Sequence, residues 1–164
     1  MSNGNEINAL AAEVIALAIK AGKTLGTAES CTGGGIGQAL TAISGSSAAY
    51  EGGVISYSNA VKTAVLGIPN EIIEFYGAVS EPVASAMALQ ARGMLGVDIA
   101  VSVTGIAGPG GGSDDKPVGM VCFGIADGGP ARTQTMQFGD LGRDGVRATT
   151  IIHALDLLKS SLKA

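Results

Sequence analysis

The spacing of apolar residues along the chain alternates several times between the period of a helix and that of a strand. Ile7, Leu10, Val14 and Ala18 recur at helical spacing, and Gly22 ends the helix that they predict. The same pattern predicts a turn at 30–35, helices at 36–44, 60–67, 68–77 and 143–162 and one after Ser80, and strands at 24–29, 54–58, 97–103, 118–126 and 133–138.

The order of these elements predicts the fold class. Helices alternate with strands through most of the chain, and the last two strands are joined by Asp-Gly-Gly-Pro at 127–130 as a hairpin before a final helix. This order is typical of a three-layer α/β/α sandwich with a mixed, mostly parallel sheet of about five strands. A chain of 164 residues is expected to form a single domain, 1–164. Ligands are expected at the carboxyl ends of the strands.

Composition excludes several classes of protein. The chain is 46% hydrophobic and 15% charged with a net charge of −4, and its ten Lys and Arg residues form no run, so no nucleic-acid partner is expected. A polar N-terminus and the lack of a ~20-residue apolar segment indicate no membrane association and a cytoplasmic location. One histidine and two separated cysteines, Cys31 and Cys122, favour reduced thiols and no metal site.

The segment GSSAAYEGGVISYSNAVK at 45–62 brings hydroxyls close in sequence to a lysine. Ser47 follows a glycine turn, Tyr57 ends a predicted strand, and Lys62 lies in the first turn of a predicted helix. The one histidine, His153, lies mid-helix and far from every serine-rich turn, so a base for a serine nucleophile is better sought among lysines and tyrosines. From spacing alone, however, a turn, a strand and a helix start are the favoured interpretation.

A lysine base needs an unusual environment. At an ordinary pKa of about 10.4, roughly one lysine in two thousand is a free amine at pH 7. A helix N-terminus lowers that pKa by less than one unit, so desolvation of Lys62 would have to supply most of the required shift.

Four blocks of sequence resemble the C-terminal domain family of the competence/damage-inducible protein CinA. They are TAESCTGG at 27–34, the segment at 45–62, GAVSEPV at 77–83 and VSVTGIAGPGGGSDDKPVG at 101–119. The resemblance covers almost the whole chain. It implies a nicotinamide-nucleotide amidohydrolase that converts nicotinamide mononucleotide to nicotinic acid mononucleotide and ammonia, with a pyridine nucleotide as its small-molecule partner and no metal or other cofactor.

The resemblance also implies roles for individual residues. Ser47 would be the nucleophile, Lys62 the base, and Tyr57 a proton shuttle or orienting group. The residues expected to contact substrate are Ser30, Thr32, Gly33, Ser46, Asn59, Thr104, Gly105 and Arg143, with Arg143 or Arg147 neutralising the phosphate.

Other interpretations stay open from the residues themselves. The chain could be a non-catalytic regulatory module that binds a pyridine nucleotide. Cys31 could act as the nucleophile, or Glu29 or Glu51 as acid or base, while a metal-dependent nucleotide hydrolase is disfavoured because no ligand cluster is present. The apolar composition and the exposed hairpin edge are compatible with a homo-oligomer.

Overall fold

The computed structural model describes residues 2–164. The helices are α1 (Asn3–Ala21), α2 (Gly35–Thr41), α3 (Asn59–Ala64), α4 (Asn70–Tyr76), α5 (Glu81–Leu95) and α6 (Gly142–Lys163), with a short 3-10 helix, η1 (Ser46–Ala48). The strands are β1 (Leu25–Glu29), β2 (Tyr50–Ile55), β3 (Ile99–Gly105), β4 (Met120–Ala126) and β5 (Arg132–Gln137).

The strands form one mixed sheet in the order β2-β1-β3-β4-β5. β1 pairs in parallel with both β2 and β3, whereas β4 is antiparallel to β3 and to β5. Four of the five strands therefore run in the same direction. The predicted fold class and the predicted hairpin between the last two strands are confirmed.

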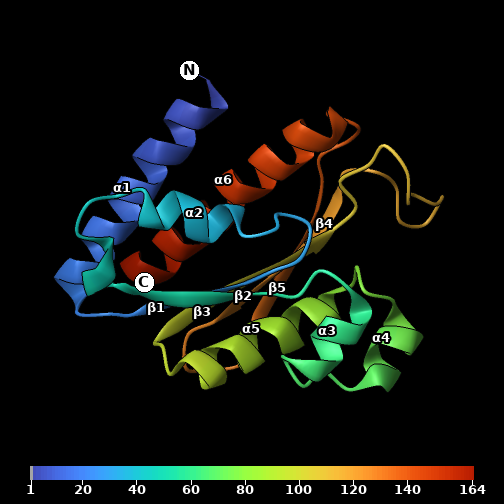
Figure 1. Cartoon of the computed structure of the whole chain (residues 1–164), viewed down its shortest axis with the longest axis horizontal. Coiled ribbons are helices and arrows are strands. Elements are labelled where there is room, and N and C mark those ends of the chain that lie inside the picture. Colours follow the sequence, from blue (N-terminus) through green and yellow to red (C-terminus); the bar gives the residue numbers. More distant parts are fainter. Residues whose placement is uncertain (1) are drawn as a thin grey trace.

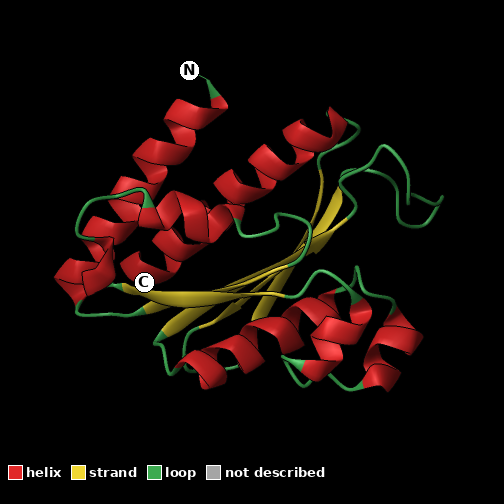
Figure 2. Cartoon of the chain, viewed as in Figure 1, coloured by secondary structure: helices red, strands yellow, loops and turns green. Residues whose placement is uncertain are grey.

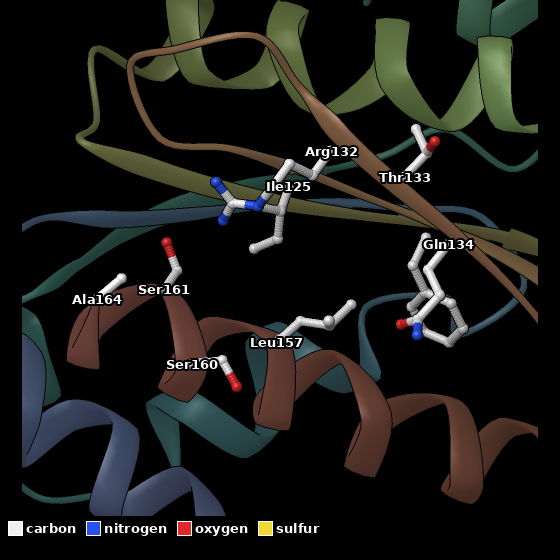
Figure 3. Close-up of a pocket in the computed structure, with 9 residues that line it drawn as sticks. Ile125, Arg132, Thr133, Gln134, Leu157, Ser160, Ser161 and Ala164 are labelled. Carbon is white, nitrogen blue, oxygen red and sulfur yellow. The ribbon is translucent and has the colours of Figure 1, made fainter.

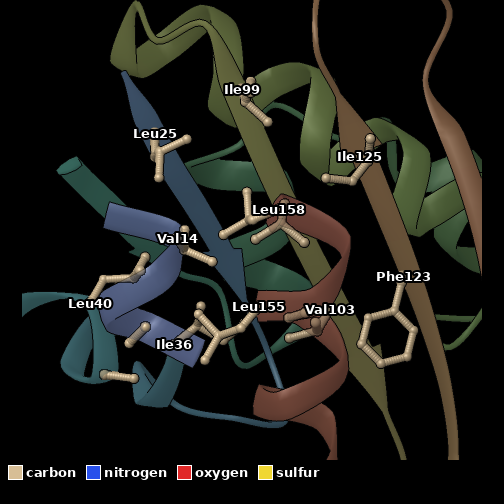
Figure 4. Close-up of a cluster of buried hydrophobic side chains, with 14 of the residues drawn as sticks. Val14, Leu25, Ile36, Leu40, Ile99, Val103, Phe123, Ile125, Leu155 and Leu158 are labelled. Atoms are coloured by element: carbon tan, nitrogen blue, oxygen red, sulfur yellow. The ribbon is translucent and has the colours of Figure 1, made fainter. Parts of the chain in front are cut away.

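Helices cover both faces of the sheet, as Figures 1 and 2 show. α1, α2 and α6 lie on one face, where their apolar stripes bury Val14, Ile36 and Leu155 against the sheet (Figure 4). α3, α4 and α5 lie on the other face, with a smaller core that includes Ile73 and Met87. Burial of these two apolar layers, with the sheet between them, is the main favourable contribution to folding.

β2 begins four residues earlier than the sequence pattern predicts and ends three residues earlier. The predicted strand, 54–58, left out Glu51 to Gly53, but Gly52 and Gly53 pair with β1, and Glu51 lies where the register of that pairing shifts. A Cβ atom on Gly53 would overlap the Thr27 hydroxyl and lie 2.7 Å from the Tyr50 hydroxyl. Position 53 is therefore a glycine because β1 and β2 approach closely here. The glycines of this segment are typical of turns, so the sequence pattern did not indicate that it belongs to a strand.

Serine caps set the start of two helices near the carboxyl ends of the strands. Ser80 caps α5 as predicted, with its hydroxyl accepting from the Val83 N–H. The helix predicted at 60–67 implies Asn59 as its cap, but the cap of α3 is Ser58, because Ser58 is extended and its hydroxyl accepts from the Val61 N–H at 3.2 Å. Asn59 is the first residue of that helix.

Candidate active site

A polar cavity of about 270 Å³ opens where the parallel strands β1, β2 and β3 end. Because these strands are parallel and in register, Glu29 lies beside both Ile55 and Val103, and the segments that follow them converge. The cavity is lined by Ser30, Cys31, Tyr57, Asn59, Lys62, Ala78, Val79, Thr104, Gly105, Ala107 and Arg143. The predicted position of the ligand site is therefore occupied by a polar pocket.

The Lys62 side chain enters this pocket from the first turn of α3. It is only 1% exposed, and no carboxylate forms an ion pair with it in the described chain. Its Nζ lies 2.9 Å from the Ser30 Oγ, 2.9 Å from the Ser56 carbonyl oxygen and 3.1 Å from the Tyr57 carbonyl oxygen. Burial lowers the pKa of Lys62 below its ordinary value of 10.5, because the charged form loses solvation.

These three contacts suit a neutral amine as well as an ammonium. An ammonium donates to all three oxygens. A neutral amine has two N–H groups for the two carbonyls and one lone pair, which then accepts a hydrogen bond from the Ser30 hydroxyl. The two backbone carbonyls thus orient the lone pair toward a single hydroxyl.

Ser30 is the first residue after β1 and is held by the neighbouring strand. Its N–H donates to the Val103 carbonyl at 3.1 Å, and its side chain is 7% exposed. The hydroxyl also lies 3.4 Å from the Tyr57 carbonyl oxygen. Ser30 lies between the end of β1 and a tight turn into α2. This position places its hydroxyl beside the buried amine of Lys62.

The predicted pairing of Ser47 with Lys62 is wrong. Ser47 lies in η1, before β2, whereas Lys62 follows the other end of that strand. A six-residue strand spans roughly 20 Å, and Figure 1 shows β2 running across the sheet from the turn after α2 to α3. Ser47 is exposed at the amino end of the strand, and Ser46 beside it is buried there, so neither reaches the pocket.

Tyr57 does reach the pocket, but its phenol does not contact the amine. The side chain is 60% exposed, and its hydroxyl accepts a hydrogen bond at 3.0 Å from Arg143 Nη2. The same guanidinium donates through Nη1 to the Gly108 carbonyl at 2.8 Å. The contact expected between the phenol and Lys62 is made by the Tyr57 carbonyl instead, because the backbone turns here from β2 into α3.

The remaining predicted contact residues divide into two groups. Asn59, Thr104 and Gly105 line the pocket, and the Thr104 hydroxyl donates to the Ala78 carbonyl at 2.9 Å, which anchors the opposite wall. Thr32 and Gly33 do not line it. Thr32 is fully buried beneath the turn, where its hydroxyl donates to Glu29 at 2.6 Å.

Cys31 lies beside Ser30 but is a poor nucleophile at neutral pH. The pKa of its thiol is raised to about 12, mainly by burial and to a smaller extent by the nearby Glu29 carboxylate. A thiol in this state has almost no thiolate. Both cysteines are buried and free, and His153 pairs with Gln134 on β5, outside the pocket.

Positive charge collects around the pocket without balancing carboxylates. The ion pairs in residues 2–164 involve Arg132, Lys159 and Lys163. Arg143 and Arg147 instead donate to neutral carbonyls, Arg147 to that of Thr32 at 3.1 Å. Arg143 lines the pocket, so its guanidinium contributes a positive local potential there in a protein that is acidic as a whole.

Away from the pocket, residues 2–164 contain an apolar hollow but no metal-ligand group. An apolar hollow lies between β5 and α6, lined among others by Ile125, Leu157 and Arg132 (Figure 3). Over residues 2–164, no three histidine, cysteine or acidic side chains are grouped as a metal site requires. In the same range, no helix combines the length and apolar character that crossing a bilayer requires.

Sequence reasoning placed Ser30 at the site but missed its contact with Lys62. The available signal was topological, because residues that follow β1 and β2 meet at one sheet edge, whereas a residue before β2 does not. Misplacing the start of β2 removed that signal. The pocket walls contributed by Ala78, Val79 and Ala107 carry no chemical signature in the sequence.

The fold and the pocket define an α/β sandwich protein with a buried serine–lysine pair at the carboxyl ends of its parallel strands. The chain belongs to the CinA C-terminal domain family, whose model matches residues 7–162. It is 51% identical over 162 residues to a CinA-like protein of Parasynechococcus marenigrum (strain WH8102), covering 98% of this chain and 39% of that relative. The chain thus spans about two-fifths of the length of that curated relative.

Solved structures of the same family agree with this fold. The competence/damage inducible protein CihA from Agrobacterium tumefaciens is 42% identical with a TM-score of 0.93, covering 97% of this chain and 96% of that one. The competence damage-inducible protein A (ComA) from Klebsiella pneumoniae is 37% identical with a TM-score of 0.92, covering 96% and 97%. At these identities, both fold and family membership are shared.

Proposed function

We infer that this protein is a metal-independent amidohydrolase with Ser30 as nucleophile and Lys62 as base. The observation that supports this proposal best is the 2.9 Å approach of the Lys62 Nζ to the Ser30 Oγ in a buried pocket. The substrate follows from the family resemblance, which implies hydrolysis of the carboxamide of nicotinamide mononucleotide to nicotinic acid mononucleotide and ammonia. The depressed pKa of Lys62 supports the base, because more of it is free amine at neutral pH.

The proposed reaction has two half-reactions with a covalent intermediate. The Ser30 hydroxyl attacks the carboxamide carbon while its proton moves to the neutral Lys62 amine. The tetrahedral intermediate collapses, the C–N bond breaks, and the leaving nitrogen takes that proton from the Lys62 ammonium as ammonia. Water then attacks the acyl-enzyme, gives a proton to Lys62, and releases the carboxylic acid as the Ser30 oxygen is reprotonated.

Two further features support binding and stabilisation of the reacting groups. The backbone N–H of Cys31, a residue that lines the pocket, donates to no other residue among residues 2–164, so it is available to a developing oxyanion. Among the described residues, the Arg143 guanidinium donates only to neutral acceptors, the Gly108 carbonyl and the Tyr57 phenol. A substrate phosphate would form stronger, charge-assisted bonds with this group.

Ammonia release from nicotinamide mononucleotide by purified protein tests the proposal. Ser30→Ala is expected to lower kcat by about 10³-fold or more, since it removes the attacking oxygen. Ser47→Ala is the matched control and is expected to keep the kcat of the parent chain, because Ser47 lies at the other end of β2.

Loss of activity in Ser47→Ala with full activity in Ser30→Ala would reject this assignment. A parent chain that binds the nucleotide without releasing ammonia would favour the non-catalytic binding module instead. Thermal unfolding of each variant separates loss of chemistry from loss of fold.

A further inference from the structure

A buried carboxylate stands immediately before the proposed nucleophile. Glu29 is the last residue of β1 and is 2% exposed. No cation forms an ion pair with it in residues 2–164. Burying a carboxylate in an apolar interior is strongly unfavourable unless its oxygens are hydrogen-bonded, so the bonds that it makes identify what it stabilises.

Both carboxylate oxygens hold the segment that follows Ser30. The first, Oε1, accepts from the Thr32 hydroxyl at 2.6 Å and from the Ile36 N–H at 2.8 Å. The second, Oε2, accepts from the Gly37 N–H at 3.0 Å. The Glu29 side chain therefore closes a loop from the end of β1, around the turn, to the first turn of α2.

The sequence of α2 explains why this carboxylate is needed. The N-cap residue of α2 is Gly34, which has no side chain to accept the first free N–H groups of the helix. Gly34 adopts φ +100°, and Gly33 before it adopts φ +60°, so the turn uses conformations that only glycine adopts at low cost. Glu29 supplies from a distance the cap that Gly34 cannot supply.

A second side chain, from the N-terminal part of α6, holds the same turn. Arg147 donates from Nη2 to the Thr32 carbonyl at 3.1 Å, and the same nitrogen lies 3.6 Å from where a Cβ of Gly33 would be. The turn at 30–34 is thus held by two side chains, the Glu29 carboxylate at the end of β1 and the Arg147 guanidinium on α6. Neither group lines the pocket.

We propose that Glu29 is a positioning residue that holds the turn carrying Ser30 in the geometry needed for attack. This inference rests on the proposed function, because it concerns the orientation of the same hydroxyl. Glu29 contacts neither substrate nor the Lys62 amine, and it acts through the backbone between residues 30 and 37. A displacement of about 1 Å in a reacting group can lower a rate by about 100-fold, so a small relaxation of this turn is enough to be measured.

Glu29→Gln is the direct test. The amide keeps the size of the side chain but replaces one carboxylate oxygen with an NH₂ group. At least one backbone N–H that donates to Glu29 in the parent chain therefore loses its acceptor. We expect kcat for ammonia release to fall about 10- to 100-fold with KM within about twofold. The pH at which activity rises should not move, because Lys62 and its acceptors are unchanged.

Two further variants keep the test decisive. Thr32→Val removes one of the three hydrogen bonds to Glu29 at nearly constant side-chain volume and should lower kcat less than Glu29→Gln does. This variant still tests the inference if Glu29→Gln does not fold. Ser102→Ala is the control, since it removes a buried hydroxyl bonded to the Ala84 carbonyl, away from the turn. It should lower the unfolding temperature while kcat stays at the parent value.

Amide hydrogen exchange gives a readout that does not depend on activity. In Glu29→Gln, exchange should become faster at the N–H groups of Ile36 and Gly37 and not across β3 or β4. Parent kcat in both Glu29→Gln and Thr32→Val, an equal fall of kcat in Ser102→Ala, or unchanged exchange at 36 and 37 would overturn the inference. A parent chain that releases no ammonia would overturn the proposed function, and the exchange data would then decide the structural role alone.

Discussion

Lys62 illustrates how one side chain acquires chemistry from its surroundings. The residue is almost fully buried, and two backbone carbonyls and one hydroxyl are its only polar contacts among the described residues. Burial disfavours the ammonium, while no carboxylate is in contact to stabilise it. The two carbonyls fix the direction of the amine lone pair. The proposed role of Lys62 as a base therefore depends on two properties, the orientation of its lone pair and its lowered pKa.

The pH dependence of activity follows from this shift. Because the neutral amine is the proposed active form, kcat/KM should rise tenfold per pH unit and level off at a pH below 10.5, where Lys62 has lost its proton. Lys62→Arg should abolish this rise and nearly all turnover, since a guanidinium is not deprotonated in proteins. Rates measured across pH 6–10 for the parent chain and the variant test this, and a variant that keeps the parent profile would contradict it.

At the scale of elements, β2 and its connections decide which residues meet. This strand starts at Tyr50 beside η1 and ends at Ile55 beside the pocket. Ser47 precedes this strand and Lys62 follows it, so the length of the strand separates the two residues. The close approach of β1 and β2 at Gly53 holds this register, because only a residue without a side chain fits there.

Alanine substitutions at two glycines should have opposite effects on stability. Gly53→Ala would place a methyl group against the Thr27 hydroxyl and 3.3 Å from the Thr27 carbonyl oxygen, and should lower the free energy of unfolding by about 1–3 kcal/mol. Gly93→Ala on α5 meets no atom within 4 Å and should raise it by about 0.5–1 kcal/mol. Denaturant unfolding of both variants checks this, and stabilisation by Gly53→Ala would contradict the proposed close approach.

At the scale of the whole molecule, the larger apolar core and the candidate active site lie in different regions. The larger apolar core lies between the sheet and the helices α1, α2 and α6, whereas the pocket lies at the carboxyl ends of β1 to β3. The net charge is −4, yet Arg143 lies at the pocket without an ion pair in the described chain. This local positive charge supports the proposed binding of a substrate phosphate in a protein that is acidic as a whole.

Truncation of a core side chain should reduce stability without changing the chemistry. Leu155 is fully buried in the larger core (Figure 4). Leu155→Ala should lower the free energy of unfolding by about 2–5 kcal/mol through lost burial and the cavity left behind. Well below the unfolding temperature, kcat should stay near the parent value.

Leu89→Ala, at a position 46% exposed, is the control and should change stability by less than about 0.5 kcal/mol. A large fall in kcat for Leu155→Ala in folded protein would show that the larger core and the pocket are coupled.

The sequence by itself determined the class of fold and the protein family. Helical spacing in residues such as Leu10 and Val14, the apolar run that became β3, and the Asp-Gly-Gly-Pro hairpin are local signals, because they arise from the periodicity of single elements. The family motifs indicated Lys62, Thr104 and Arg143 as pocket residues, and the structure brings all three to one cavity.

Only the tertiary structure decided which hydroxyl faces the amine. Ser47 is closer to Lys62 in sequence than Ser30 is, but parallel pairing brings the carboxyl ends of β1 and β2 together and carries Ser47 to the far end of the sheet. The role of Glu29 was hidden for the same reason, since its partners lie in a turn and a helix whose geometry depends on neighbouring elements. Sequence distance within one segment does not measure spatial distance across a sheet, and the strand pairing sets the latter.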